Sequence, residues 1–350
     1  MSPVPSRVGI IANPLSGSDI RRLVALGSVY GAQEKINIVQ RVLAGLQALD
    51  VEEIYLMPGM FGIARQALEK LPRRLDGLRA RSRLIDMPVE NAAADSTCAA
   101  REMRRQGVGC IVVLGGDGTT RAVAGGCQDV PILPISTGTN NVVPYRIEGT
   151  VAGIAAGFVA RHSELVEEVA YRSKRLEVQS ENEAATSALV DVAVVEGEAV
   201  GSGAIWDPSL LRQVILTRGE PGAVGMSSLA GFLAPVGPED PWGLCLSLGK
   251  PEISRVTVPL APGLVTPLNI RAWRRLAVDE SVVVHGGGRL LALDGEREIV
   301  LRRGQAVRIF LRNDGPWIVD ALHALRVATE QGFFVHSGVA QTQQALEEPS

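Results

Sequence analysis

The sequence feature that most constrains the fold is an apolar run that ends in a glycine-rich turn, residues 110–120. Its first five residues, CIVVL, are typical of a buried parallel strand. Three of the next four residues are glycine, which lets backbone N–H groups approach an anion because it has no Cβ. A helix from about Thr119 would direct the positive end of its dipole to the same place. The stretch predicts a phosphate-binding strand–turn–helix unit, although Asp-Gly also occurs in ordinary turns.

Length and composition narrow the class of protein. A chain of 350 residues exceeds the usual size of a single core, so two domains are expected. A net charge of −3 and 4% aromatic residues give no reason to expect nucleic acid or an anionic membrane as a partner. The 4 cysteines have no metal-site spacing, and no apolar run reaches the ~18 residues of a membrane span. We therefore expect a reduced, cytoplasmic protein.

The order of strand and helix patterns divides the chain. Up to about residue 147, apolar runs alternate with helical periods, which predicts a doubly wound α/β domain with a mainly parallel sheet over 1–147. Short strands separated by turns follow, so a mainly antiparallel β domain is predicted for 148–316, with a role in acceptor binding or oligomerisation. The helical period returns at 317–332, and this element is expected to pack on the first domain.

Three predicted strands of the first domain end in loops of the same chemistry. The loops are 13–17, 115–120 and 136–141, and they are rich in glycine, hydroxyl and amide groups. The carboxyl ends of parallel strands form the ligand crevice of such a sheet. Three loops of this kind at one edge predict a nucleotide or phosphate site.

The motifs resemble those of a known superfamily. The sequence lacks both the P-loop and the G-x-G-x-x-G fingerprint. Instead, GGDGT at 115–119 resembles the motif shared by NAD kinases, diacylglycerol and sphingosine kinases and phosphofructokinases. GTNN at 138–141, NPLSG at 13–17 and the DGE hairpin at 294–296 are similar to other motifs of this superfamily, and they occur in the same order.

Within this superfamily, the sequence most resembles the AcoX group, the NAD-kinase-like proteins of acetoin operons. The resemblance covers residues 13–22, 203–207 and 221–231. The last of these stretches lacks the Thr-Ala-Tyr core that lines the dinucleotide site of true NAD kinases. Their acceptor-binding Asn-Glu pair corresponds here to Val190-Asp191, so one acidic residue remains.

The resemblance assigns roles to individual residues. Asp117 is the expected catalytic residue, either as general base or as a metal-linked carboxylate, with Glu296 as the second expected Mg²⁺ ligand. Asn141, Asp191 and Ser227 are expected to bind the acceptor. The donor phosphates are expected to contact Asn13, Gly17, Gly115, Gly116, Gly118, Thr119, Thr120, Gly138, Thr139 and Asn140.

These residues imply a Mg²⁺-dependent phosphotransferase of the NAD kinase type. Its donor would be ATP or polyphosphate, and its acceptor a hydroxyl group of NAD, a related nucleoside or a small alcohol. A lipid kinase and a non-catalytic nucleotide-binding regulator of acetoin catabolism are the alternatives. The sequence shows no basic membrane patch, which disfavours the lipid kinase. A homodimer is expected from the habit of the family.

Overall fold

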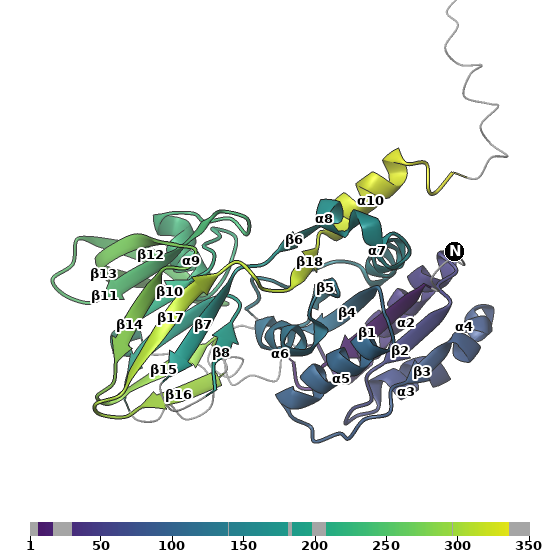
Figure 1. Ribbon diagram of the computed structural model, residues 1–350, viewed down its shortest axis with the longest axis horizontal. Coiled ribbons are helices and arrows are strands. Elements are labelled where there is room, and N and C mark those ends of the chain that lie inside the picture. The colour runs from purple at the N-terminus through teal and green to yellow at the C-terminus, as the bar shows by residue number, and fades with distance from the viewer. Residues whose placement is uncertain are drawn as a thin grey trace, which may run out of the picture.

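The computed structural model describes residues 6–16, 30–138, 140–180, 184–197, 208–295 and 297–335 of the chain. It consists of two lobes joined by the segments around β6 and β18 (Figure 1). One lobe is an α/β domain and the other is built of antiparallel sheets, which confirms the predicted fold class.

The α/β lobe contains a 7-stranded sheet in the order β3-β2-β1-β4-β5-β18-β6. Its pairs are parallel except β18–β6, which is antiparallel. The strands are β1 (Arg7–Ala12), β2 (Glu53–Leu56), β3 (Ser82–Leu84), β4 (Cys110–Gly115), β5 (Ile132–Ser136), β6 (Ala170–Arg172) and β18 (Trp317–Val319). The central strands are buried on both faces, which explains why residues 110–114 are uniformly apolar.

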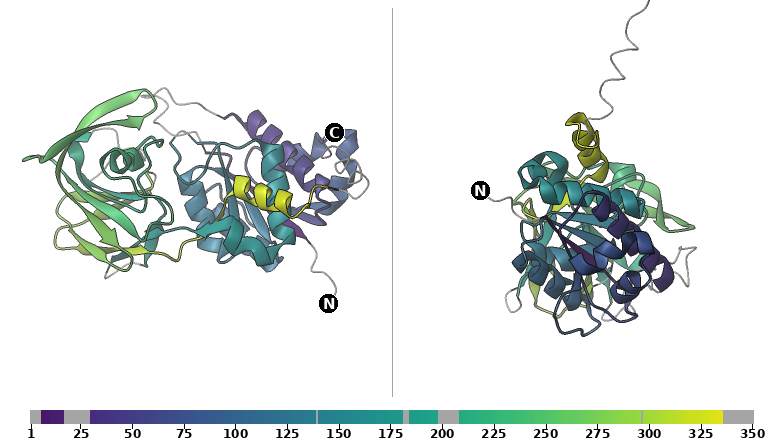
Figure 2. Two further views of the ribbon diagram at one scale, coloured as in Figure 1. Left: turned by 90° about the horizontal axis from the view of Figure 1, so that it is seen from above. Right: turned by 90° about the vertical axis from the view of Figure 1, so that its right-hand side faces the viewer.

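Helices cover both faces of this sheet (Figure 2). They are α2 (Ala32–Ala48), α3 (Ile63–Glu69), η1 (Arg73–Leu75), α4 (Asp76–Arg81), α5 (Ala93–Arg105), α6 (Asp117–Cys127), α7 (Gly149–Arg161), η2 (Ser163–Leu165), α8 (Val166–Val169) and α10 (Ala321–Glu330). Helices α2 and α7 cross closely, and glycine permits this contact. A Cβ on Gly153 would lie 2.2 Å from the carbonyl oxygen of Val42.

The second lobe is a sandwich of two antiparallel sheets, ordered β12-β13-β11-β10-β9-β15-β16 and β14-β17-β7-β8. A shared apolar core lies between them, and α9 (Met226–Leu233) packs on the outer face of the larger sheet. The other elements are β7 (Arg175–Ser180), β8 (Thr186–Ala188), β9 (Asp191–Glu196), η3 (Pro208–Leu210), β10 (Leu211–Leu216), β11 (Trp242–Leu248), β12 (Ser254–Ala261), β13 (Leu264–Ala277), β14 (Ser281–His285), β15 (Arg289–Leu293), β16 (Arg297–Leu301) and β17 (Ala306–Arg312).

The boundary between the lobes differs from the expected position near residue 147. Helix α7 belongs to the core of the α/β lobe, and β6 pairs within its sheet, so the change to the second lobe comes after Arg172. The predicted C-terminal helix begins with a strand, β18, which joins the first sheet, and α10 then packs against α7. The apolar pattern of residues 149–161 is equally compatible with either lobe, so the sequence could not locate the boundary. Among the described residues, no helix has the length and apolarity that a membrane span requires.

Candidate active site

The three loops predicted to bind phosphate lie next to one another. Strand β1 pairs with β4, and β4 pairs with β5, so their carboxyl ends are neighbours in the sheet. The order of the strands reverses between β1 and β4, and ligands of open α/β sheets bind at such a switch point. The second lobe faces this edge through its 189–191 and 294–295 segments, which share a pocket with Asp117.

Asp117 is the first residue of α6, and its carboxylate is buried. Oδ1 accepts hydrogen bonds from the backbone N–H groups of Val143 at 2.8 Å and Val142 at 3.2 Å, and Oδ2 accepts one from Val142 at 3.0 Å. Burial raises the pKa of Asp117 to about 7, and the negative charge of Asp294 acts in the same direction. A carboxyl group with a pKa near neutrality is suited to accept and release a proton.

The glycine turn and the first loop are joined by side chains. Asn13 Nδ2 donates to Thr119 Oγ1 at 2.8 Å, while Thr120 Oγ1 donates to the carbonyl oxygen of Gly116 at 3.0 Å. Gly118 lies in the first turn of α6 and is buried. A Cβ on Gly115 would lie 2.4 Å from Thr119 Cβ, which explains why glycine is required at this position.

The third loop is folded around Asn141. The side chain of Asn141 contacts Ser136 Oγ at 2.6 Å. A Cβ on Gly116 or on Gly138 would lie within 2.8 Å or 2.7 Å of Asn141 Oδ1, respectively. Both glycines therefore allow the second and third loops to approach each other through this amide.

Asp294 joins the second lobe to helix α6. Its side chain is wholly buried, and Oδ1 accepts the backbone N–H groups of Val190 at 2.8 Å, Leu189 at 3.1 Å and Asp191 at 3.3 Å. Oδ2 forms an ion pair with Arg121 Nη1 at 3.2 Å, one helical turn after Asp117. The hairpin predicted to carry a metal ligand thus uses its aspartate to attach the second lobe to α6.

Two pockets meet beside Asp117 and share Val142. The smaller has a volume of about 50 Å³ and is lined by Asp117, Asn140, Val142, Asp191, Val224, Gly225, Met226, Leu260, Asp294 and Gly295. The larger has a volume of about 250 Å³ and is lined by Ser136, Gly138, Asn141, Val142, Pro144, Tyr145, Arg146, Glu220, Gly222 and Ala223. Asp117 and Asp191 therefore line the smaller pocket, whereas the larger one borders the third glycine-containing loop and includes Glu220.

Asn140 has an unsatisfied group in the smaller pocket. Its Nδ2 donates to the carbonyl oxygen of Leu260 at 3.5 Å. Its Oδ1 is buried and has no hydrogen-bond donor among the described residues. An amide oxygen in this situation favours a ligand that donates a hydrogen bond, because leaving it unpaired is costly.

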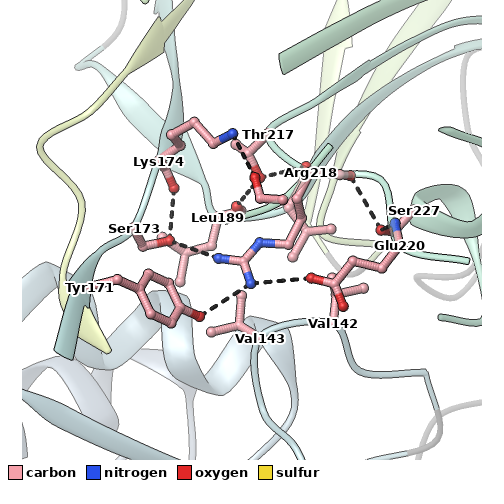
Figure 3. A network of polar contacts seen from close by, with 12 residues as sticks. Val142, Val143, Tyr171, Ser173, Lys174, Leu189, Thr217, Arg218, Glu220 and Ser227 are labelled. Atoms are coloured by element: carbon pink, nitrogen blue, oxygen red, sulfur yellow. Dashed lines mark hydrogen bonds and ion pairs between the residues drawn. The ribbon is translucent and has the colours of Figure 1, made fainter. Parts of the chain in front are cut away.

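Sequence reasoning did not find the buried Arg218, which lies where the two lobes meet (Figure 3). Its guanidinium donates to Tyr171 Oη at 3.2 Å and Ser173 Oγ at 3.3 Å, and it lies 3.6 Å from Glu220 Oε1. Ser227 supports the same loop, since its Oγ donates to the carbonyl oxygen of Arg218 and accepts the N–H of Glu220. Ser227 is fully buried and does not line either pocket.

The expected magnesium site is not formed by the part of the chain that the structure describes. No group of three His, Cys, Asp or Glu side chains there is arranged to hold a metal ion. Glu296, the second expected ligand, lies outside the described residues, as do Gly17 and Thr139.

Comparison with known proteins gave matches over nearly the whole chain. Residues 8–162 match the family described as the ATP-NAD kinase N-terminal domain, and residues 174–314 match the acetoin catabolism protein X C-terminal domain. Acetoin catabolism protein X of Cupriavidus necator is 35% identical over 352 residues, which cover 98% of this chain and 95% of the relative.

Solved structures of kinases resemble the fold more distantly. Yeast NADH kinase complexed with NADH matches with a TM-score of 0.49 at 14% identity, over 95% of this chain and 89% of the other. An NAD kinase from Archaeoglobus fulgidus in complex with ATP matches with a TM-score of 0.40 at 13% identity, over 94% of this chain and 100% of the other.

Proposed function

The chain belongs to the acetoin catabolism protein X family and carries an ATP-NAD kinase N-terminal domain, and we propose that it is a phosphotransferase of the NAD kinase type. It would transfer a phosphoryl group from ATP or polyphosphate to a hydroxyl group of NAD, a related nucleoside or a small alcohol. The observation that carries this proposal is Asp117, a buried carboxylate with a pKa of about 7, beside two adjoining pockets.

In the proposed reaction, each substrate would occupy one of the two pockets. The donor phosphates would lie against the third loop in the larger pocket, and the acceptor hydroxyl would enter the smaller one. Its oxygen attacks the terminal phosphorus as the bond to the leaving phosphate oxygen breaks, and Asp117 Oδ2 takes the hydroxyl proton. Phosphoryl transfer depends mainly on positioning and charge stabilisation, which the loops are suited to provide.

Asn140 fits the acceptor side of this arrangement better than the donor side on which the resemblance put it. Its free Oδ1 accepts hydrogen bonds, as an acceptor hydroxyl requires, whereas an ionised phosphate has no proton to offer. Asp191 lines the same pocket and would accept a hydrogen bond from a second hydroxyl. Asp117 and Asp191 place two carboxyl groups at this pocket, which favours a neutral, hydroxyl-bearing group over an anionic one.

Phosphorus NMR of the protein with Mg-ATP or polyphosphate tests this function directly. The acceptors would be NAD, NADH, adenosine, small diols, and diacylglycerol in mixed micelles. A new phosphate monoester signal with a soluble acceptor, absent in Asp117→Asn, supports the proposal. Turnover of diacylglycerol alone would favour a lipid kinase. Nucleotide binding without any turnover would favour a regulator.

Asp191→Asn is expected to raise the KM for the acceptor by about tenfold while lowering kcat by no more than about twofold. The reason is that Asp191 would bind the acceptor equally in the ground state and the transition state, and loss of such uniform binding appears in KM. Steady-state kinetics with the best acceptor of the panel measures both constants. A fall in kcat with unchanged KM would contradict this role.

A further inference from the structure

Lys35, which has no role in the proposed reaction, is buried beneath the first of the three loops. It lies in the first turn of α2 and is 1% exposed. Its ammonium group donates hydrogen bonds to three backbone carbonyl oxygens of one short turn, those of Asn13 at 3.0 Å, Pro14 at 3.0 Å and Ser16 at 2.8 Å. All three donors of a lysine ammonium are thus used on the 13–16 turn.

This turn is connected to each of the other loops. Asn13 contacts Thr119 through its amide, at the start of α6. Ser16 Oγ lies 2.7 Å from Thr137 Oγ1, at the end of β5. The ammonium therefore fixes a turn whose side chains join the first loop to the second and to the third.

The directions of the groups indicate why a cation is placed there. With three carbonyl oxygens of the turn bound to Lys35, the negative ends of these peptide dipoles are directed at the ammonium group. Without the ammonium group, three carbonyl oxygens of the turn would lose their hydrogen-bond donor, which is energetically costly. We infer that Lys35 is a positioning residue for the donor site, which holds the 13–16 turn, and through it all three loops, in the shape that binds the donor phosphates. This inference rests on the proposed function.

The charge of Lys35 is sensitive to pH. Burial lowers the pKa of Lys35 to about 8, and burial is the one cause of that shift found among the described residues. The protonated form, which satisfies all three carbonyl oxygens, is thus present at pH 7 and mostly lost at pH 9. If the donor binds only to the protonated form, the apparent dissociation constant of the donor is inversely proportional to the protonated fraction of Lys35. It should therefore rise about tenfold from pH 7 to pH 9.

Lys174 provides a matched control for this effect. It is also 1% exposed, and it also donates to backbone carbonyl oxygens, those of Gly237 and Trp242, but it lies in the second lobe. Burial lowers the pKa of Lys174 to about 8 as well. The two lysines therefore differ in what they hold, while they share burial and protonation behaviour.

Calorimetric titration of Mg-ATP into Asp117→Asn protein at pH 7 and pH 9 tests the inference, with polyphosphate as a second donor. Asp117→Asn serves as the background because Asp117 itself titrates near pH 7. We expect the dissociation constant to rise about tenfold with pH. Adding Lys35→Met should weaken binding at pH 7 at least tenfold and abolish the pH dependence, whereas adding Lys174→Met should change neither.

NMR of the lysine side chains gives a second readout that does not depend on how Lys35→Met folds. The chain has only four lysines, Lys35, Lys70, Lys174 and Lys250, so single substitutions assign their signals. At a free Mg-ATP concentration of about nine times its dissociation constant, the titration midpoint of Lys35 should move upward by about one pH unit, because coupling between proton and donor is reciprocal. A donor that binds without moving this midpoint, or binds Lys35→Met with unchanged affinity, would overturn the inference. If neither Mg-ATP nor polyphosphate binds, the proposed phosphotransferase function is wrong, and the role of Lys35 is then wrong as well.

Discussion

Replacing Asp117 with asparagine is expected to lower kcat by about 10²- to 10⁴-fold, the range typical of a positioned general base. The substitution is local in its effect because Asn Oδ1 can still accept the N–H groups of Val142 and Val143, which now contact Asp117 Oδ1. The affinity for Mg-ATP should change little, since in the proposed arrangement the donor binds to the loops and not to Asp117. Steady-state assays of product formation measure kcat, and calorimetric titration measures the affinity for Mg-ATP.

The pH dependence of the wild-type rate follows from the same carboxylate. The pKa of Asp117 is raised to about 7, so kcat at saturating donor should increase about tenfold per pH unit below pH 7 and level off above it. The folded protein binds the Asp117 proton more tightly than the unfolded chain does. The free energy of unfolding therefore decreases as the pH rises from about 4 through 7. Asp117→Asn should therefore be more stable than wild type at pH 8. A variant with an unchanged rate would exclude Asp117 as the base.

Asp294→Ala is expected to lower the free energy of unfolding by about 3–5 kcal/mol, the usual cost of removing one partner of a buried ion pair. The substitution leaves Arg121 without its carboxylate and removes the acceptor of three backbone N–H groups, including that of Val190. Urea unfolding measured by circular dichroism gives this value. Because the charge of Asp294 helps to raise the pKa of Asp117, the acid limb of any remaining activity should move to lower pH.

Asp279→Ala is a matched control for the strain that alanine causes at a position with positive φ. Asp279 and Asp294 both have positive φ, 66° and 50°, so alanine is strained at each position. The side chain of Asp279 is 71% exposed in its ion pair with Arg312, and pairs of that kind contribute ~1 kcal/mol or less. Equal destabilisation by the two substitutions would contradict the anchoring role of Asp294.

The edge of the parallel sheet could be predicted from the sequence because the signals there are local. The apolar run at 110–114 ends at glycines, and strands β1 and β5 likewise end in polar loops, so parallel pairing brought the three loops together as expected. The smaller pocket also contains Asp117 and Asp191, which the resemblance had singled out.

The residues that were missed act across long sequence distances. Lys35 and Arg218 are buried cations, and nothing in their neighbouring residues distinguishes them from exposed ones. The sequence pattern does not indicate strand β13, because Pro267 and three exposed arginines, Arg271, Arg274 and Arg275, obscure its alternation. The DGE hairpin was recognised, but its aspartate binds α6 and the 189–191 backbone, a contact that only the folded chain creates.

The position of β18 has a consequence for synthesis on the ribosome. This strand lies between β5 and β6 in the first sheet, although the whole second lobe precedes it in the chain. Domains usually fold one after another as the N-terminal part emerges. Here β6 can join the first sheet only after residues 317–319 have been synthesised, because β18 pairs with both β5 and β6. All strands of the antiparallel lobe are synthesised before that point. During translation, the nascent α/β lobe therefore exposes the open edge of β5, and an unpaired strand edge of this kind can pair with other chains.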